Sequence, residues 1–388
     1  MKKFVIGILL LVVIGVGAFL YWRSQQRAPL ATEIVALQSA QGAEGFARVT
    51  EARVMKFPDD HGPHPDFQTE WWYYTGNLQA EDGRRFGYQL TFFRRGITAG
   101  DNAARASDWA TNQIYFAHFA LTDEKNNTHD ETEIFSRGAA GLAGASGDPF
   151  RVWIENWSSE GLNRDASNVK LIAEDGKMAI ELNLNAAKAP VVHGERGLSQ
   201  KTETVGNASY YVSFTRMPTQ GTVRVNGGTF SVTGTSWFDH EWGTTSLGAN
   251  AAGWDWFSIQ LDDNRELMFF QVRNKDGGIE ALSSGTLIEA DGTTKFLKRD
   301  DVKITPQQFW TSNFSQGKYP SQWRVSSEAG NFDLTLKPLI ADQEMRVSFT
   351  YWEGAVNVEG TSNGKNVRGQ GYVEMTGYAA QARGDVGY

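Results

Sequence analysis

Residues 177–184 read KMAIELNL, and their apolar side chains, from Met178 to Leu184, recur at every second position. Successive side chains of a β-strand point to opposite faces, so this spacing predicts a strand with one buried face. The stretch FGYQLTFF at residues 86–93 alternates in the same way. Because a helical period is nearly absent after residue 53, the pattern predicts an all-β fold.

Turn signals separate the strand-like runs, at Asp82-Gly83, Asp175-Gly176, Asn226-Gly227, Asp276-Gly277 and Asp291-Gly292. These pairs tolerate the positive φ that tight hairpins require, and no crossover helix is predicted between the runs. The sequence therefore indicates antiparallel sheets, most simply closed barrels or sandwiches. The small-residue stretch GTTSLGANAAG at 243–253 suggests a boundary between domains at 53–245 and 246–388.

The composition excludes several classes of function. The chain has 388 residues, a formal net charge of −8 and no cysteine. Nucleic-acid binding needs clustered positive charge, and thiol nucleophiles, disulfides and zinc–thiolate sites need cysteine. The sequence also contains no HExxH motif, no GxSxG elbow and no phosphate-binding glycine loop before a helix. We therefore expect no metal, no cofactor and no nucleic-acid partner.

The N-terminus indicates export. Lys2 and Lys3 precede nineteen uncharged residues from Phe4 to Trp22, and a helix of that length spans about 28 Å, close to the thickness of a hydrocarbon core. We predict a transmembrane signal-anchor or a cleaved signal peptide at 1–23, followed by a polar stalk at 24–52. The globular part is expected in the periplasm, either anchored to the inner membrane or released.

The first candidate site lies in HGPHPDFQTEWWYYTGNL, residues 61–78. On a strand, Glu70, Trp72 and Tyr74 would share one face. Burial among aromatic rings would raise the pKa of the Glu70 carboxyl and make it a candidate general acid. Alternatively, Glu70 is a structural residue that accepts backbone N–H groups.

The second candidate site is SWFDHEWGTTSLG, residues 236–248. Alternation would place Asp239 and Glu241 on one face of a strand and His240 and Trp242 on the other. Polar groups this dense among tryptophans are costly to bury, so Asp239, His240 and Glu241 are candidate catalytic residues. The alternative is that they hold a domain junction together by hydrogen bonds.

The third candidate is GWDWFSIQLDD, residues 253–263. Trp254 and Trp256 would share a face and Asp255 would point away, so the two indoles line either a ligand cavity or the core. His118, within the apolar stretch NQIYFAHFALTD, is either a core histidine or a second imidazole beside His240.

Five stretches together resemble one known family: EWWYYTGNL (70–78), SYYVSFTRM (209–217), SWFDHEWG (236–243), GWDWFSIQLDD (253–263) and GQGYVEMTGY (369–378). In this order they are similar to the carotenoid 1,2-hydratase-like proteins, a group that includes AttH and the predicted secreted hydrolases. The resemblance implies two tandem lipocalin-like antiparallel β-barrel domains over about residues 53–380.

The resemblance also implies a chemistry. A carotenoid hydratase protonates an alkene to a carbocation and adds water, which requires an acid, a water-orienting base and aromatic faces. The expected His-x-Trp element matches His240 and Trp242. The tyrosine and aspartate expected on a following strand are absent from RELMFFQVR (265–273), where Phe270 and Gln271 stand. Many relatives without this acid accompany ABC-transporter operons.

We therefore expect an exported, membrane-anchored protein that binds a hydrophobic lipid- or isoprenoid-like ligand. As a hydratase or hydrolase it would use Glu70 or Asp239 as the acid and His240 as the base. The alternative is a non-catalytic lipid carrier or an accessory protein of an ABC transporter. The residues expected to contact the ligand are Trp72, Tyr74, His118, Trp242, Trp254, Asp255 and Trp256.

Overall fold

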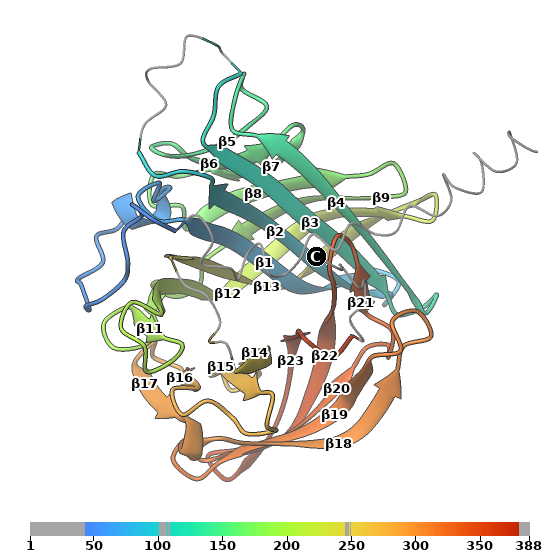
Figure 1. Ribbon diagram of the computed structural model, residues 1–388. Coiled ribbons are helices and arrows are strands. Elements are labelled where there is room, and N and C mark those ends of the chain that lie inside the picture. The colour runs from blue at the N-terminus through green and yellow to red at the C-terminus, as the bar shows by residue number, and fades with distance from the viewer. Residues whose placement is uncertain (1–42, 101–106, 108, 245–247, 249, 380–388) are drawn as a thin grey trace, which may run out of the picture.

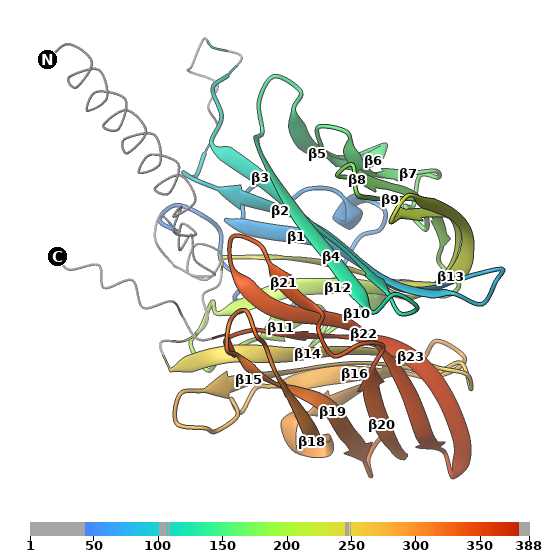
Figure 2. The same cartoon turned by 90° about the vertical axis from the view of Figure 1, so that its right-hand side faces the viewer.

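A computed structural model describes residues 43–100, 107, 109–244, 248 and 250–379. It confirms the all-β class and contains two antiparallel sheets that form two barrel-like units (Figure 1). The first sheet curls into a nearly closed barrel and the second into a half-barrel (Figure 2), whereas we expected two closed barrels. In the described part of the chain no helix is long and apolar enough to cross a membrane. The segment predicted to do so, residues 1–23, lies outside that part.

The first sheet has the strand order β4-β3-β2-β1-β13-β12-β9-β8-β7-β6-β5, with β10 and β11 paired to β12. Its strands are β1 (Thr69–Ala80), β2 (Arg85–Gly96), β3 (Gln113–Asp123), β4 (Thr128–Arg137), β5 (Ala143–Gly147), β6 (Phe150–Ile154), β7 (Trp157–Gly161), β8 (Asn168–Glu174), β9 (Met178–Asn185), β10 (Val191–Val192), β11 (Leu198–Gln200), β12 (Ala208–Val225) and β13 (Gly228–Gly243). A 3₁₀ helix, η1 (Asp59–His61), precedes β1.

The second sheet has the order β17-β16-β15-β14-β23-β22-β20-β19-β18, with β21 paired to β22. Its strands are β14 (Ala251–Leu261), β15 (Glu266–Asn274), β16 (Ser284–Ile288), β17 (Thr294–Lys298), β18 (Lys303–Thr311), β19 (Lys318–Ser327), β20 (Phe332–Pro338), β21 (Glu344–Arg346), β22 (Thr350–Ser362) and β23 (Lys365–Met375). The 3₁₀ helix η2 (Arg299–Asp301) follows β17.

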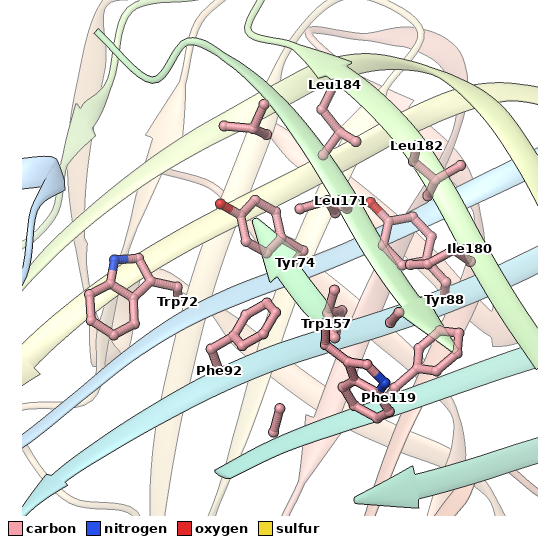
Figure 3. Close-up of a cluster of buried hydrophobic side chains, with 14 of the residues drawn as sticks. Trp72, Tyr74, Tyr88, Phe92, Phe119, Trp157, Leu171, Ile180, Leu182 and Leu184 are labelled. Atoms are coloured by element: carbon pink, nitrogen blue, oxygen red, sulfur yellow. The ribbon is translucent and has the colours of Figure 1, made fainter. Parts of the chain in front are cut away.

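The alternating stretch KMAIELNL forms most of β9, and its burial alternates as expected. Its apolar side chains enter the core of the first sheet, where they meet Trp72, Tyr74 and Trp157 (Figure 3). The stretch FGYQLTFF in β2 differs, because it is buried on both faces. One face of β2 lines the barrel interior, and the other approaches β22 of the second sheet.

The two sheets meet along β1, β2, β4 and β12 on one side and β14, β21, β22 and β23 on the other. A separate aromatic cluster lies in this contact, with Tyr73, Tyr211 and Trp237 from the first sheet and Trp256 and Phe270 from the second. The central strands therefore have no solvent-facing side, and the polar residues on their outer faces are buried between the sheets.

Residues 43–52, the described end of the segment assigned to a stalk, lie against the first sheet. Val49 is completely buried, and it packs with Trp242 and Tyr210. The backbone N–H of Ala47 donates to the carbonyl of Asp66.

Candidate functional site

The predicted alternation along β1 and β13 is confirmed. The two strands pair so that Trp72 lies opposite His240 and Tyr73 lies opposite Asp239. Trp72 belongs to the interior of the first barrel, whereas Tyr73 belongs to the cluster between the sheets. The predicted site residues are thereby divided between two faces, and each face forms a separate polar cluster.

On the first face, one carboxylate gathers two imidazoles and a guanidinium. Glu70 Oε1 lies 2.8 Å from His240 Nε2 and 2.9 Å from His64 Nδ1. Arg94 Nε donates to Glu70 Oε2 at 2.8 Å. We call His64, Glu70, Arg94 and His240 the histidine cluster. The sequence predicted Glu70 and His240 as site residues and left Arg94 open as a surface residue or a wall of the site; Arg94 lies directly opposite Glu70 on β2.

The expected rise in the pKa of Glu70, which made it a candidate general acid, is not found. Burial would raise the pKa of its carboxyl, but Arg94 and the hydrogen bonds from His240 and His64 lower it well below its usual value. Glu70 is therefore a carboxylate that holds no proton to donate near neutral pH.

The protons of the histidine cluster reside on the rings. Burial opposes charge on His64, yet its hydrogen bonds to Asp60 and Glu70 raise its pKa above the usual value. Burial lowers the pKa of His240, and the Glu70 carboxylate offsets only part of that effect.

The indole of Trp242 stacks on His64 with ring centroids 3.8 Å apart and an interplanar angle of 4°.

This cluster holds a chain segment in place. The backbone N–H of His64 donates to Glu70 Oε2 at 2.9 Å. Arg94 Nη2 donates to the carbonyl oxygens of His64 and Phe67 at 2.8 and 2.9 Å. The structural alternative for Glu70, a carboxylate that accepts backbone N–H groups, therefore describes its contacts. A metal could also find three ligand atoms here within 4.8 Å of one another, but the Arg94 guanidinium already neutralises Glu70.

On the opposite face of β13, Asp239 lies between the two sheets. Its Oδ2 accepts a hydrogen bond from Tyr211 Oη at 2.7 Å, and its Oδ1 accepts one from Trp237 Nε1 at 2.6 Å. Ser213 Oγ also donates to Oδ1. Trp256 of the second sheet donates its indole N–H to Tyr211 Oη at 2.9 Å. Asp239 is thus framed by hydroxyl and indole groups.

The pKa of the Asp239 carboxyl is raised into the neutral range. Burial raises the pKa of its carboxyl to about 7, although Ser213, Tyr211 and Trp237 act in the opposite direction by stabilising the anion. The neighbouring Glu241 carboxylate adds to the rise. Asp239 therefore has the property that the sequence analysis attributed to Glu70.

The other predicted residues of this region have separate environments. Glu241 pairs with Lys201 at 2.8 Å, and Asp255 pairs with Arg273 at 3.0 Å on the other face of β14. Trp254 and Trp256 share a face, as predicted, and both pack into the contact between the sheets. Of these residues, only Trp256 belongs to the hydrogen-bonded chain at Asp239 among the described residues.

Two further carboxyls in the same layer were not predicted. Glu353 on β22 lies directly opposite Glu374 on β23; the Glu353 side chain is buried and that of Glu374 is half-buried. Trp254 Nε1 donates to Glu374 Oε1 at 3.1 Å. Both residues stand in aromatic–glycine stretches, YWEGAVNVEG and GQGYVEMTGY. The only sign of these two carboxyls in the sequence was the first glutamate after an aromatic residue in each stretch. We call Asp239, Glu353 and Glu374, with the aromatic side chains around them, the inter-sheet layer.

His118 does not join His240. It lies opposite Glu133 in the β3–β4 pair, and its Nδ1 is 2.9 Å from Tyr351 Oη of the second sheet. The second imidazole beside His240 is that of His64, with ring centroids 5.5 Å apart. The sequence analysis missed His64, although it lies only six residues before Glu70.

The fold and the two clusters define a class of protein in which two curved antiparallel sheets enclose a buried layer of carboxyl and aromatic groups. The chain belongs to the AttH-like family, whose model matches residues 48–378. This match confirms the family resemblance indicated by the five sequence stretches.

Similar proteins cover nearly the whole chain. Kievitone hydratase of Fusarium solani subsp. phaseoli is 23% identical over 356 residues, which are 85% of this chain and 95% of that protein. A crystal structure of an AttH protein from Nitrosomonas europaea is 33% identical, with a TM-score of 0.76, over 86% of this chain and 100% of that one. The structure of kievitone hydratase from Nectria haematococca shares the fold at 15% identity, with a TM-score of 0.65 over 85% and 95% of the two chains.

Proposed function

We propose that this protein is a lipocalin-like hydratase that adds water to a carbon–carbon double bond of a hydrophobic, isoprenoid- or lipid-like ligand. Asp239 is the proposed acid. The observation that carries the proposal is a carboxyl with a raised pKa, buried between two sheets and bordered by Trp237, Tyr211 and Trp256. Similarity to a protein named kievitone hydratase supports the same reaction class.

The reaction has physical requirements that this site can meet. The Asp239 O–H bond breaks as its proton forms a C–H bond with one alkene carbon, and the other carbon becomes a cation. Electron-rich faces of indole and phenol rings stabilise such a cation. Water then forms the C–O bond and loses one proton to a carboxylate of the inter-sheet layer. A carboxyl whose pKa lies near the working pH suits this proton transfer.

His240 does not act as the base for Asp239 in this proposal. The two residues are adjacent on β13, so their side chains point to opposite faces of the strand. One ligand between the sheets would not contact both side chains. His240, with Glu70, instead positions the segment that closes the other face.

The test measures water addition. The purified domain is incubated with kievitone or with an acyclic carotenoid in heavy-oxygen water, and the products are analysed by mass spectrometry. Wild-type protein is expected to add one labelled oxygen to at least one probe. Asp239→Asn, which is nearly isosteric, is expected to bind that probe but to lose turnover. His240→Gln is the matched control on the opposite face and should retain turnover.

Two results would overturn the proposal. Turnover by Asp239→Asn at the wild-type rate would remove Asp239 as the acid. Tight binding of the probes by wild-type protein without any water addition would favour the alternative, a lipid carrier or an accessory protein of an ABC transporter.

We also propose that the globular part acts in the periplasm, anchored through residues 1–23. The support is the run of nineteen uncharged residues behind two lysines. Cell fractionation of the full chain tests this proposal, because recovery in the cytosol would contradict it.

A further inference from the structure

The carboxyl groups of the inter-sheet layer are hydrogen-bonded by neutral side chains among the described residues. The hydrogen bonds of Asp239 come from neutral donors, and the same is true of the bond from Trp254 to Glu374. Glu353 hydrogen-bonds to the phenols of Tyr73 and Tyr351, and Tyr372 Oη has no hydrogen-bond partner among the described residues. A layer that served only to dock the sheets would pair its carboxyls with cations or replace them with apolar groups.

Glu353 and Glu374 form a close pair. They are directly opposite each other in the β22–β23 ladder, where side chains of facing residues are about 5 Å apart. Burial and the facing Glu374 carboxyl both raise the pKa of Glu353, so the pair favours the state that holds a proton. Glu374 also lies opposite Trp256, which connects to Asp239 through Tyr211.

A chain of proton-carrying groups leads from this pair toward the surface. Tyr351 lies two positions before Glu353 on β22, so the two side chains share a face. Tyr351 Oη is 2.9 Å from His118 Nδ1. On the other side of that ring, His118 Nε2 is 3.6 Å from Oε2 of Glu133, whose side chain is 22% exposed. Phenol, imidazole and carboxyl groups can each accept one proton and release another.

We propose that Glu353 and Glu374 accept the proton released by the adding water and exchange it with solvent through Tyr351, His118 and Glu133. The role in hydration rests on the proposed function. The water O–H bond breaks and a carboxyl O–H bond forms, while Asp239 has given its own proton to carbon. The pair then releases its proton to solvent and one proton returns to Asp239, so the cycle is neutral overall.

The experiment needs no ligand. Infrared spectra of the intact domain at neutral pH record the C=O stretch of protonated buried carboxyls, and transfer into heavy water shifts each band as O–H becomes O–D. Glu374→Gln and Glu353→Gln should each change this set of bands. His118→Phe and Tyr351→Phe should retain the bands but slow their exchange by about tenfold or more, because exchange then requires opening of the structure.

His129→Phe is the matched control. His129 is a half-buried imidazole on the neighbouring strand β4 and bonds to Thr122, outside the proposed chain. Its substitution should leave the exchange rate unchanged. Absence of carboxylic-acid bands from the wild-type spectrum would overturn the proposal, as would wild-type exchange in Tyr351→Phe, which removes a single oxygen. Neither result depends on whether the protein hydrates an alkene.

Discussion

Glu70 and Arg94 are both completely buried, and each is the other's principal counter-charge. Removal of one partner of such a pair leaves an uncompensated charge in the interior. We expect Arg94→Met to lower the free energy of unfolding by about 3–5 kcal/mol. Urea denaturation followed by tryptophan fluorescence measures this loss.

The surface pair Arg324–Asp333 is the control for this prediction, since its side chains are 55% and 45% exposed. Arg324→Met should change stability far less, because water solvates the remaining carboxylate. The double variant Arg94→Met/Glu70→Gln should recover part of the loss. Equal effects of the buried and exposed arginines would contradict this account of the histidine cluster.

Asp239 makes stability depend on pH. The carboxyl has a pKa of about 7 in the folded protein and an ordinary pKa of 3.8, so between these pH values the folded state holds a proton that the unfolded chain has lost. Its contribution is complete below the unfolded pKa and disappears as the pH rises to about 7. Asp239→Asn should remove this decline, which amounts to about 1.4 kcal/mol per pH unit.

The measurement compares unfolding free energies of Asp239→Asn and wild type at several pH values between about 5 and 7. The comparison isolates Asp239 from the groups that face it, which are Glu241 on its own strand, Tyr211 on β12 and Glu374 on β23. The exposed Asp333→Asn variant should show no change in slope in this range, because the pKa of its carboxyl is lowered by Arg324. Parallel curves for wild type and Asp239→Asn would show that Asp239 is ionised.

At the scale of the strands, the sequence predicted which side chains share a face but not which face is functional. Alternation along β13 correctly separated Asp239 from His240. The period of two could not reveal that the outer faces of β1 and β13 are covered by a second sheet, because this contact joins residues far apart in the chain. Glu353 and Glu374 were missed for that reason: each becomes significant only when β22 and β23 pair and pack on β14.

The pKa of Glu70 was predicted in the wrong direction for a related reason. Local sequence showed four aromatic neighbours and therefore burial. The guanidinium that reverses the effect of burial comes from β2, twenty-four residues later, and the register of the β1–β2 hairpin places it opposite. Burial was predictable, but the charge that compensates it was not.

The close approach of β2 to β22 depends on Gly87. A Cβ atom at this position would lie 2.6 Å from the Cβ of Ala355. Gly87→Ala should therefore force the strands apart and lower the free energy of unfolding by about 1–3 kcal/mol. Chemical denaturation of Gly87→Ala, Ala355→Gly and the double variant tests the contact. The double variant should lose less stability than the sum of the single losses, and simple additivity would contradict the contact.

At the scale of the whole molecule, the two sheets are joined by charges as well as by aromatic rings. Glu266, at the start of β15, is completely buried and forms ion pairs with two cations from the part of the chain that forms the first sheet. Lys188 Nζ lies 2.7 Å from its carboxylate, and Arg216 is the second partner. Arg216 and Lys188 also donate to backbone carbonyls of the second unit, at Leu261 and Asn264. Opening the contact would break these ion pairs and hydrogen bonds and expose the groups to water.

We therefore expect wild-type protein to unfold in one cooperative transition, although it contains two sheets with separate cores. Glu266→Ala leaves two half-buried cations without their carboxylate, which should cost about 3 kcal/mol and destabilise mainly the contact between the sheets. Calorimetry should then resolve two transitions, with a van't Hoff enthalpy below the calorimetric one. Glu174→Ala is the matched control, because its carboxylate pairs with Arg224 at an exposed position within the first sheet. That variant should keep the single transition. A single transition in Glu266→Ala, or two transitions already in wild type, would show that this ion cluster does not couple the sheets.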